Sequence, residues 1–351
     1  MTKTCYTLLK ADWYLTCWGE LMAGRRGRRA LTVDEERHKL LAGVASMYYE
    51  QGMTQEEIAR ELKYSRSGIS RLLAEAHEAH IVEIRIHWPL IRSRSSEQTL
   101  LQRFSVLREV HVLTCTTLTY AQTLRQLGEH AARLVEQWVE DGMVLGVSWG
   151  TGVYEVASAL RPNRTYPDLT VVQMIGALGT ADPQIDGPEL ARRVAQAYGG
   201  RYQILPAPLI VETEAMRNAL LTDRRIRQVL DLAQRARVAI VGVGSTDPNV
   251  SSMVRAGYLT VEEIRRIAAQ GAVGDVCGIH FDVHGNLLNM PIGRRIVGIQ
   301  PDALRRIPLV LGIAAGPSKA PAILGALRAR LINTLVTDEA TARQVLALSG
   351  E

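Results

Sequence analysis

From residue 110 onward, short apolar runs alternate with stretches of helical periodicity, and this alternation restricts the fold more than any other feature. The runs are nearly continuous in Val, Leu, Ile and Ala, as in strands that are buried on both faces. Such strands, with helices between them, form a mostly parallel sheet that is covered on both sides. We therefore expect an α/β domain with strands at 110–115, 143–149, 169–176, 201–205, 237–244, 296–299, 309–315 and 333–337, and with helices that include 119–140, 186–198, 260–269, 319–330 and 338–348.

The composition agrees with a globular chain of more than one domain. The chain has 351 residues, of which 47% are hydrophobic and 22% charged, so it can bury a sizeable core. Its four Cys have no metal-ligand spacing, as expected for unpaired thiols in a reducing cytosol. No apolar run approaches the ~20 residues that cross a bilayer. We expect a cytoplasmic protein without a metal or another cofactor.

Residues 1–33 are expected to lie outside the folded domains. The first 21 residues are interrupted by Lys10, Asp12 and Glu20 and lack a cleavage site, so they do not resemble a signal peptide. Because "MAGRRGRRALTVDEERHKLL" reads as the start of a protein, Met22 is a candidate initiator, and we interpret 1–33 as a disordered extension or an over-extended start. Two readings of "RRGRR" stay open, a basic arm that contacts phosphates and a solvated tail.

Residues 34–87 predict a small, separate module. An amphipathic helix over 34–51 is followed by Thr54 and Glu57, the spacing of a capping box that begins a short helix. Ser65 is placed to cap a third helix, and "IVEIRIHW" at 81–88 alternates as a strand does. Helix, short helix, turn, longer helix and strand make a winged helix-turn-helix. The expected inner faces are Leu40, Leu41, Val44, Met47 and Tyr48, then Ile58, Ala59 and Leu62, then Ile69, Leu72, Leu73 and Ala76.

The beginning of the third helix has the chemistry of a DNA-reading surface. Three cations and no acidic residue lie between Lys63 and Arg71, although residues 1–90 as a whole carry 13 Lys and Arg against 12 Asp and Glu. Recognition helices meet base edges at this end, where Arg pairs with guanine or phosphate and Ser hydroxyls donate to either. Gly68 costs the helix about 1 kcal/mol against Ala, and either close approach to DNA or a weakened helix would account for it. A three-helix packing unit without a ligand is the alternative.

Glycine-rich loops follow four of the predicted strands. Ligands of parallel α/β folds bind at the carboxyl ends of the strands, where free backbone N–H groups at helix starts favour anions. Any single loop of this kind is more often a tight strand-to-helix turn. Four together, one with a Lys, favour a small phosphorylated ligand. The loops contain Gly150, Thr151 and Gly152; Gly176, Ala177, Leu178 and Gly179; Gly242, Gly244 and Ser245; and Gly316, Ser318 and Lys319.

The acidic and His residues of "GDVCGIHFDVHGN" have weaker signals. Asp275 is interpreted as a ligand contact, and Asp282 as a turn former in a hairpin. His280 and His284 flank Asp282, but solvated side chains on a strand and turn are the simpler explanation than a metal site. Residues 88–108 are interpreted as a connector whose amphipathic part, "TLLQRFSVL", either pairs with a second copy or packs on its own domain.

Several of these motifs together resemble the SorC family of bacterial sugar-responsive transcriptional regulators. The resemblance runs from residue 35 to the end and is carried by "TQEEIA", "YSRSGISRLL", "SWGTGVYEVASAL", "LPAPLIVE", "GDVCGIHFDVHGN" and "LRARLINTLVTDEATARQVL". Two departures are Ala315-Gly316-Pro317, where two Gly are common, and Ile279-His280, where polar or aromatic residues are frequent. Both leave the identity of the ligand open.

The resemblance implies a DNA-binding domain at 34–87 and an effector domain at 109–351 that is related to sugar-phosphate isomerase folds. It implies an operator partner, a sugar or sugar-phosphate effector and a homo-oligomer, a dimer or tetramer. The implied DNA contacts are Thr54, Gln55, Lys63, Ser65, Arg66, Ser67, Ser70 and Arg71. The implied effector contacts are Gly150, Thr151, Gly152, Asp275 and Lys319, with Asp247 and Gly176, Ala177, Leu178 and Gly179 nearby.

The expected function is therefore a transcriptional regulator of a carbohydrate operon and not an enzyme. The alternative is a sugar-phosphate isomerase with an added helical domain, which would need a carboxylate or His placed as a general base. No acid/base pair stands out, and Lys319 is interpreted as an anion clamp. A protein-interaction scaffold would leave the four glycine loops unexplained.

Overall fold

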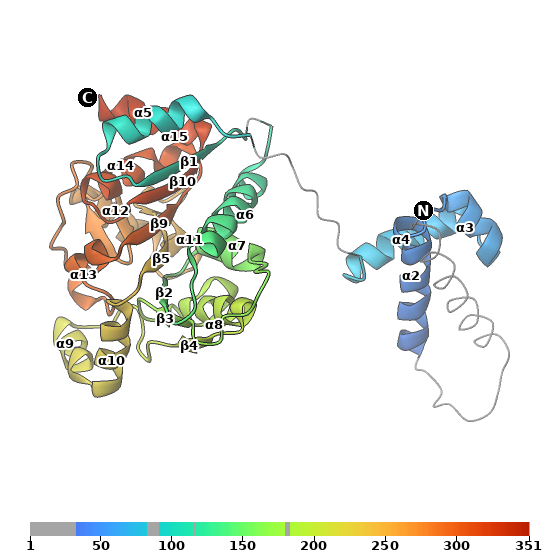
Figure 1. The fold of residues 1–351 in the computed structure, drawn as a ribbon, viewed down its shortest axis with the longest axis horizontal. Helices are drawn as coiled ribbons and strands as arrows, with labels where there is room; N and C mark the ends of the chain where they lie inside the picture. The colour runs from blue at the N-terminus through green and yellow to red at the C-terminus, as the bar shows by residue number, and fades with distance from the viewer. Residues whose placement is uncertain (1–32, 83–90, 116, 180–182, 351) are drawn as a thin grey trace. The chain divides into compact units, whose positions relative to one another are not determined.

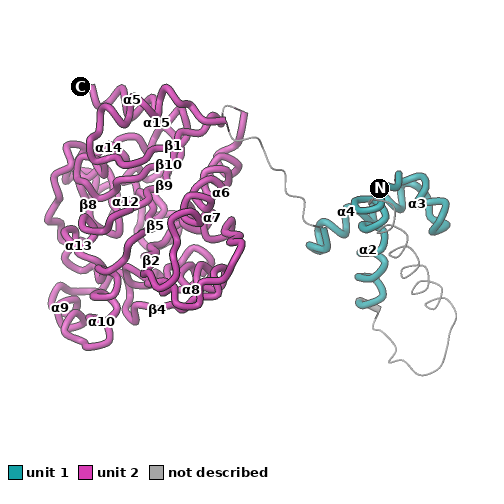
Figure 2. Tube along the Cα trace, in the orientation of Figure 1, with its two compact units in different colours: residues 1–87 teal, residues 88–351 magenta. Residues whose placement is uncertain are grey.

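The computed structural model describes residues 33–82, 91–115, 117–179 and 183–350. They divide into two compact units, one up to residue 87 and one from residue 88 (Figure 2). Of the predicted extension at 1–33, residues 1–32 lie outside the described residues and Val33 begins a helix. The predicted wing strand at 81–88 lies outside them from residue 83 onward, and its described residues Ile81 and Val82 are not in a strand.

In the smaller unit the described residues form three helices around one apolar core. These are α2 (Val33–Tyr49), α3 (Gln55–Leu62) and α4 (Arg66–Glu78). The three helices match the expected order, and each contributes its predicted inner face. The fully buried side chains Val44, Ile58, Ile69 and Ala76 come from all three helices, so each helix buries its apolar face against the other two. The helix-turn-helix prediction is confirmed over the described residues.

The turn between α3 and α4 is fixed by two caps. Thr54 and Glu57 form the predicted capping box at the start of α3, and Ser65 Oγ accepts the Gly68 N–H at 3.0 Å at the start of α4. Between them Lys63 adopts the left-handed conformation with φ 57°, which ends α3. A Cβ at Gly68 would lie 3.2 Å from the capping Ser65 Oγ, so the glycine leaves room for the cap.

The larger unit is built on a seven-stranded sheet, with every neighbouring pair parallel and the order β1-β10-β9-β5-β2-β3-β4 (Figure 1). From β2 the chain runs outward through β3 and β4, and then returns to β5 and continues in the opposite direction. The reversal between β2 and β5 is a topological switch point, where such sheets leave a crevice at their carboxyl edge. The strands are β1 (Glu109–Leu113), β2 (Val144–Val147), β3 (Thr170–Gln173), β4 (Arg201–Gln203), β5 (Val238–Gly242), β9 (Leu309–Ile313) and β10 (Thr334–Asp338).

Helices cover both faces of this sheet, as the apolar runs predict. On β5, Val238 and Ile240 belong to one core cluster, and Ala239 and Val241 to the other, because alternate side chains point to opposite faces. One face packs against α6 (Tyr120–Trp138), α7 (Thr151–Ala159) and α8 (Gly187–Tyr198). The other packs against α5 (Arg94–Arg103), α10 (Arg224–Ala233), α12 (Val261–Ala269), α13 (Pro301–Arg306), α14 (Ala320–Arg328) and α15 (Glu339–Ser349). The α/β class and the five expected helices are confirmed.

The connection from β5 to β9 contains a second, antiparallel sheet. Its strands are β6 (Gly244–Ser245), β7 (Gly274–Val276) and β8 (Ile279–Phe281), in that order. The short helix α11 (Ser252–Arg255) follows β6, and α9 (Glu214–Thr222) lies before α10. The predicted strand at 296–299 is wrong, because Ile296 and Gly298 make only single bridges, to Ile210 and Ile175.

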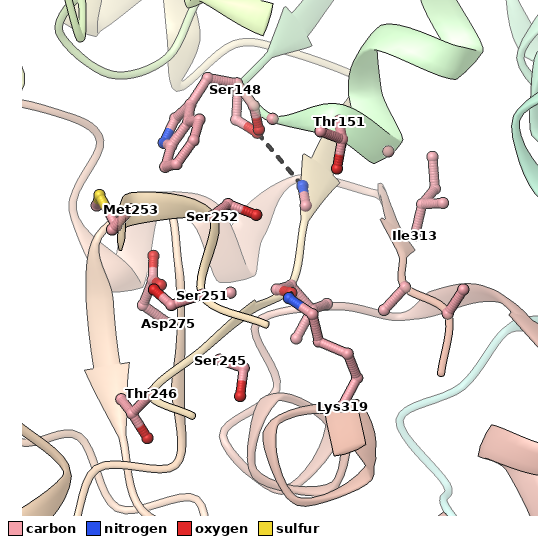
Figure 3. A pocket seen from close by; sticks show the side chains of 18 of the residues that line it. Ser148, Thr151, Ser245, Thr246, Ser251, Ser252, Met253, Asp275, Ile313 and Lys319 are labelled. Carbon is pink, nitrogen blue, oxygen red and sulfur yellow. Dashed lines mark hydrogen bonds between the residues drawn. The ribbon is translucent and has the colours of Figure 1, made fainter. Parts of the chain in front are cut away.

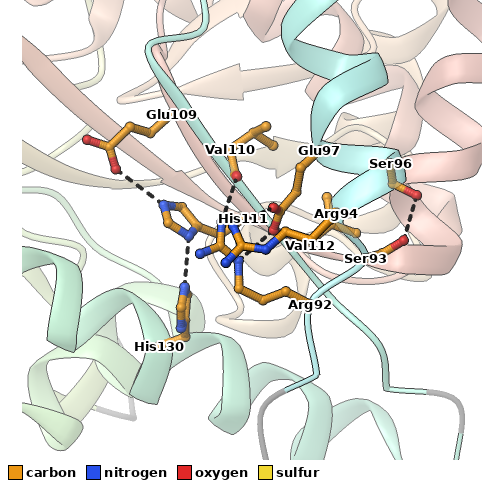
Figure 4. Close-up of polar contacts among 10 residues, drawn as sticks. All are labelled: Arg92, Ser93, Arg94, Ser96, Glu97, Glu109, Val110, His111, Val112 and His130. Carbon is orange, nitrogen blue, oxygen red and sulfur yellow. Dashed lines mark hydrogen bonds and ion pairs between the residues drawn. The ribbon is translucent and has the colours of Figure 1, made fainter.

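The first described residues of the larger unit are anchored to its edge strand (Figure 4). Arg92 bridges to Leu113 of β1, and its Nε donates to Glu97 Oε1 at 2.7 Å. The Glu97 carboxylate is 4% exposed and also accepts the Val112 N–H at 3.0 Å. Helix α5, within the range expected to be a connector, buries Leu100 in the core of the larger unit.

Two histidines beside this anchor are expected to make the folded protein less stable at acidic pH. His130 on α6 lies 2.9 Å from His111 on β1, and burial lowers the pKa of His130 from 6.5 to about 4 (Figure 4). Between these values the unfolded chain binds the proton and the folded chain does not, so stability falls as the pH falls from about 6.5 to 4. We expect His130→Gln to flatten this slope in melting temperature against pH, whereas exposed His284→Gln keeps it. An unchanged slope in His130→Gln would contradict the assignment.

Candidate functional site

A cavity lies over the carboxyl ends of three adjacent central strands, β9, β5 and β2 (Figure 3). The loop after β2 contributes residues from Ser148 to Gly152, and the loop after β5 contributes residues from Gly242 to Thr246. The loop after β9 contributes Ala314, Ala315 and Lys319. The small sheet contributes Asp275 and His280 to the lining, and the turn between β7 and β8 contributes Cys277. Segments far apart in the sequence therefore meet at the switch point of the main sheet.

The start of α7 gives this cavity an uncapped helix terminus. Gly150 is the residue before the helix, and no side chain caps the helix there. Its φ of 116° is one that residues with a side chain rarely adopt, so glycine is required at this turn. The amides of the first helical turn have no partner within the helix, and with the positive end of the helix dipole they favour an anion. Thr151 adds a hydroxyl beside them (Figure 3).

Lys319 contributes a buried amine to the same cavity. It lies in the 3-10 turn before α14, is 5% exposed, and its Nζ donates to the Val243 carbonyl at 2.9 Å. Burial lowers the pKa of Lys319 from 10.5 to about 8, and Asp275 opposes this shift. One carbonyl leaves donors of the ammonium group available to a ligand. A buried cation of this kind is stabilised when an anion binds beside it.

Asp275 lies in the cavity wall, and the backbone around it holds its side chain in place. It lies on β7, directly across from Gly244 on β6, and its Oδ2 accepts the Gly278 N–H at 3.0 Å. A Cβ at residue 244 would overlap Asp275 Oδ1, so the glycine makes room for the carboxylate. Carboxylate oxygens are acceptors and suit the hydroxyl groups of a sugar.

The close approach of Gly244 to the Asp275 carboxylate predicts the effect of Gly244→Ala. The added methyl group displaces the Asp275 carboxylate, while the φ of Gly244 is one that alanine tolerates. We expect a folded protein whose effector affinity falls at least roughly 10-fold, as for loss of a charged hydrogen bond. Thermal shift with sugar phosphates measures this. Gly293→Ala, with no atom near the added Cβ, is the matched control. Equal affinity of the two variants would contradict the role of Gly244.

Two groups of predicted effector residues do not line the cavity. The loop after β3 uses its amides internally, since Leu178 N–H and Gly179 N–H each donate to the Asp186 carboxylate at 2.9 Å. Gly176 and Ala177 likewise donate to backbone carbonyls. Asp247 accepts from Asn249 and lies beside the loop, not among the lining residues. Of the predicted set, the structure brings together Gly150, Thr151, Gly152, Asp275 and Lys319.

Other lining residues were not among the predicted contacts. Ser252 and Met253 come from the short helix α11 and Ser251 directly precedes it, whereas Trp149 lies in the loop after β2 and Tyr120 begins α6. They lack the glycine pattern that marks the other loops, so only the folded chain shows them. His280 was interpreted as solvated, and this was wrong, because it is 5% exposed. Asp282 is the turn former expected, since its carboxylate accepts from Asn286 N–H at 2.8 Å.

The predicted DNA contacts lie around the α3–α4 turn of the smaller unit. Lys63, Arg66, Ser67, Ser70 and Arg71 are exposed. Arg66 approaches Glu56 at 3.8 Å, and both side chains are about 70% exposed. Such an exposed ion pair is too weak to hold the Arg66 side chain in place. The Thr54 and Ser65 hydroxyls are occupied in their caps. The exposed face at the start of α4 is thus basic, and its side chains are available to a partner.

The described residues contain no group of three or more His, Cys, Asp or Glu side chains placed to hold a metal ion. Among the helices of these same residues, none has the length and apolar character to cross a membrane.

Comparisons with known proteins match both units. Residues 89–347 match the Sugar-bind family, described as a sugar-binding domain, and residues 44–79 match region 4 of sigma-70, a helix-turn-helix. The deoxyribonucleoside regulator of Bacillus subtilis is 30% identical over 314 residues, covering 90% of this chain and 99% of that protein. The sorbitol operon regulator of Klebsiella pneumoniae is 31% identical over 309 residues, covering 88% and 98%.

The full-length crystal structure of the Klebsiella pneumoniae sorbitol operon regulator SorC has a similar fold. It superposes with a TM-score of 0.66 at 30% identity, covering 89% of this chain and 99% of that one. Because these relatives are transcriptional regulators and span nearly the whole chain, the isomerase alternative is discarded. This chain belongs to the SorC family of DNA-binding transcriptional regulators with a sugar-binding domain.

Proposed function

We propose that this regulator reads its operator with the start of α4 and senses a phosphorylated sugar in the cavity over β9, β5 and β2. The observation that carries the proposal is the pairing, in one cavity, of an uncapped helix start at Gly150 with the buried amine of Lys319. Both groups favour an anion, and a phosphate has oxygens enough to engage both.

The remaining lining residues suit a ligand whose phosphate is attached to a polyhydroxylated carbon skeleton. Asp275 supplies acceptors, and Ser245, Ser251 and Ser252 supply hydroxyl groups around it (Figure 3). Trp149 adds an apolar surface that suits the carbon face of a sugar. The effector is thus a sugar phosphate whose phosphate lies at the start of α7 and whose hydroxyls face Asp275.

The operator contacts divide into two kinds. Arg66, Ser67, Ser70 and Arg71 extend from the exposed start of α4, the end of a recognition helix that meets base edges. Lys63 and Gln55 are placed to contact phosphates at the turn and at the start of α3. Thr54 and Ser65 order these helix starts through their caps.

Regulation works through linkage between the two units in a homo-oligomer, a dimer or tetramer, in the bacterial cytoplasm. A two-fold dimer presents its recognition helices to half-sites ~34 Å apart or a multiple of that. The sugar phosphate binds one arrangement of the protein more tightly and shifts the population toward it, which changes operator affinity. The genes controlled are those of a carbohydrate operon, as in the relative named for sorbitol.

The test is a titration of labelled DNA from the protein's own upstream region, followed by fluorescence anisotropy. Sequence-specific binding that changes with one of a panel of sugar phosphates, and not with the matching free sugars, is the expected result. Binding weakens steeply as salt rises, because phosphate contacts release counterions. DNA binding that no sugar phosphate changes would refute the effector class, and turnover of a sugar phosphate would refute the regulator.

A further inference from the structure

His280 is a buried polar residue in the wall of the effector cavity. It lies at the centre of β8, is 5% exposed and is one of the cavity-lining residues. In the β7–β8 pairing it stands directly opposite Asp275, so the two side chains lie on the same face of the small sheet. The neighbouring pair, Gly274 and Phe281, lies on the other face, where Phe281 is fully buried in the core.

One nitrogen of this imidazole has no partner. Among the described residues, no atom hydrogen-bonds His280 Nδ1, although it is out of contact with solvent. A buried polar atom without a hydrogen bond destabilises the folded protein, and an apolar side chain of similar shape would remove that cost. Tight packing does not require a polar atom at this position, so the unpartnered nitrogen indicates a contact that the unliganded protein lacks.

The surroundings of His280 favour the neutral imidazole. Burial lowers the pKa of His280, while Asp275 opposes the shift less strongly. The other charged or titratable side chains that line the cavity are Tyr120, Asp275, Cys277 and Lys319. A neutral ring offers Nδ1 as either a donor or an acceptor, which suits a hydroxyl group, since a hydroxyl can take the complementary role.

We propose that His280 is a specificity-determining residue of the effector site and that Nδ1 hydrogen-bonds a hydroxyl of the sugar next to the hydroxyl held by Asp275. Side chains directly across an antiparallel pair have Cβ atoms about 4.5–5.5 Å apart, a spacing that two neighbouring hydroxyls of one sugar can span. The inference rests on the proposed effector class and deepens it. The site then selects sugar phosphates with a pair of adjacent hydroxyls and discriminates against deoxy analogues, because a missing hydroxyl leaves buried polar groups unpaired.

The test compares two substitutions that separate hydrogen bonding from packing. His280→Phe keeps a planar ring without a polar atom, and His280→Asn places an amide nitrogen near the position of Nδ1. His284→Phe is the matched control, because His284 is an exposed histidine on the same hairpin. The readouts are the melting temperature of the unliganded full chain and its shift with ribose 5-phosphate, 2-deoxyribose 5-phosphate, glucose 6-phosphate and 2-deoxyglucose 6-phosphate.

We expect His280→Phe to fold with an unchanged or higher unliganded melting temperature and to need at least 10-fold more of the responsive sugar phosphate. His280→Asn should recover most of that loss, and His284→Phe should behave as the wild type. A wild-type response that His280→Phe leaves unchanged would overturn the inference alone. Loss of unliganded stability in both His280 variants would assign the residue to packing and overturn it too. No response of the wild type to any of the four compounds would overturn the proposed effector class and the inference with it.

Discussion

Arg71→Ala is expected to weaken operator binding by about 1–3 kcal/mol, or roughly 5- to 150-fold, and to leave the effector response intact. Arg71 lies in the second turn of α4 and is exposed, and among the described residues its Nε makes a long 3.4 Å contact with the Ser67 carbonyl. Its guanidinium is in no ion pair with another described residue, so it can contact guanine or phosphate. The apolar core of the smaller unit is formed by other side chains, so the substitution should not unfold it.

The control for Arg71→Ala is Arg265→Ala on α12. Arg265 is an exposed arginine of the larger unit, and its removal changes the net charge by the same amount. Anisotropy with operator DNA at two salt concentrations measures both variants, and melting curves with sugar phosphate measure the effector response. Equal losses of DNA affinity in the two variants would mean that overall charge, and not the α4 surface, determines binding. Loss of the effector response in Arg71→Ala would contradict the division between the units.

Lys319→Met is expected to abolish most of the effector response while DNA binding persists. The substitution removes the buried ammonium that we propose pairs with the phosphate, and loss of one partner of a buried charged hydrogen bond costs about 2–5 kcal/mol, or roughly 30- to 5,000-fold in affinity. The unliganded protein should become more stable. At pH 7 the folded state holds a charge whose pKa is lowered from 10.5 to about 8, a difference worth on the order of 3 kcal/mol. A gain in melting temperature together with a lost response separates this role from packing.

The same pKa predicts the pH dependence of the effector response. As the pH rises through about 8, the Lys319 amine of the free protein loses its charge, so sugar-phosphate affinity should fall.

The pKa of Lys319 in the folded protein also lies below its ordinary value, so the unfolded chain binds more protons between pH 8 and 10.5. The stability of the unliganded protein therefore rises with pH in that window. Neither slope should appear in Lys319→Met. Lys39→Met, at an exposed position on α2, is the control and should keep both slopes. A wild-type affinity that stays constant from pH 7 to 9 would contradict a charged Lys319 contact.

The parts of this protein that sequence determines are those set by local chemistry. The spacing of Thr54 and Glu57 specifies a capping box, because two residues three apart can satisfy each other's backbone amides at a helix start. Continuous apolar runs specify strands buried on both faces, and the runs at 237–244 and 309–315 contain β5 and β9. The presence of Gly150 and Lys319 in the cavity lining was predictable, because a few consecutive residues are enough to indicate a tight turn or a cation at a helix start.

Other features depend on contacts that no short stretch of sequence contains. The loop 176–179 has the same glycine signal as 150–152, yet Asp186 occupies its amides, and nothing in the loop itself indicates that partner. Gly244 and Asp275 are 31 positions apart, and only the β6–β7 pairing shows that one makes room for the other. The position of His280 likewise depends on strand pairing. Its letters predict a solvated histidine, whereas the register of β7 and β8 buries it opposite Asp275, because the face of a strand residue is decided by its pairing and not by its own chemistry.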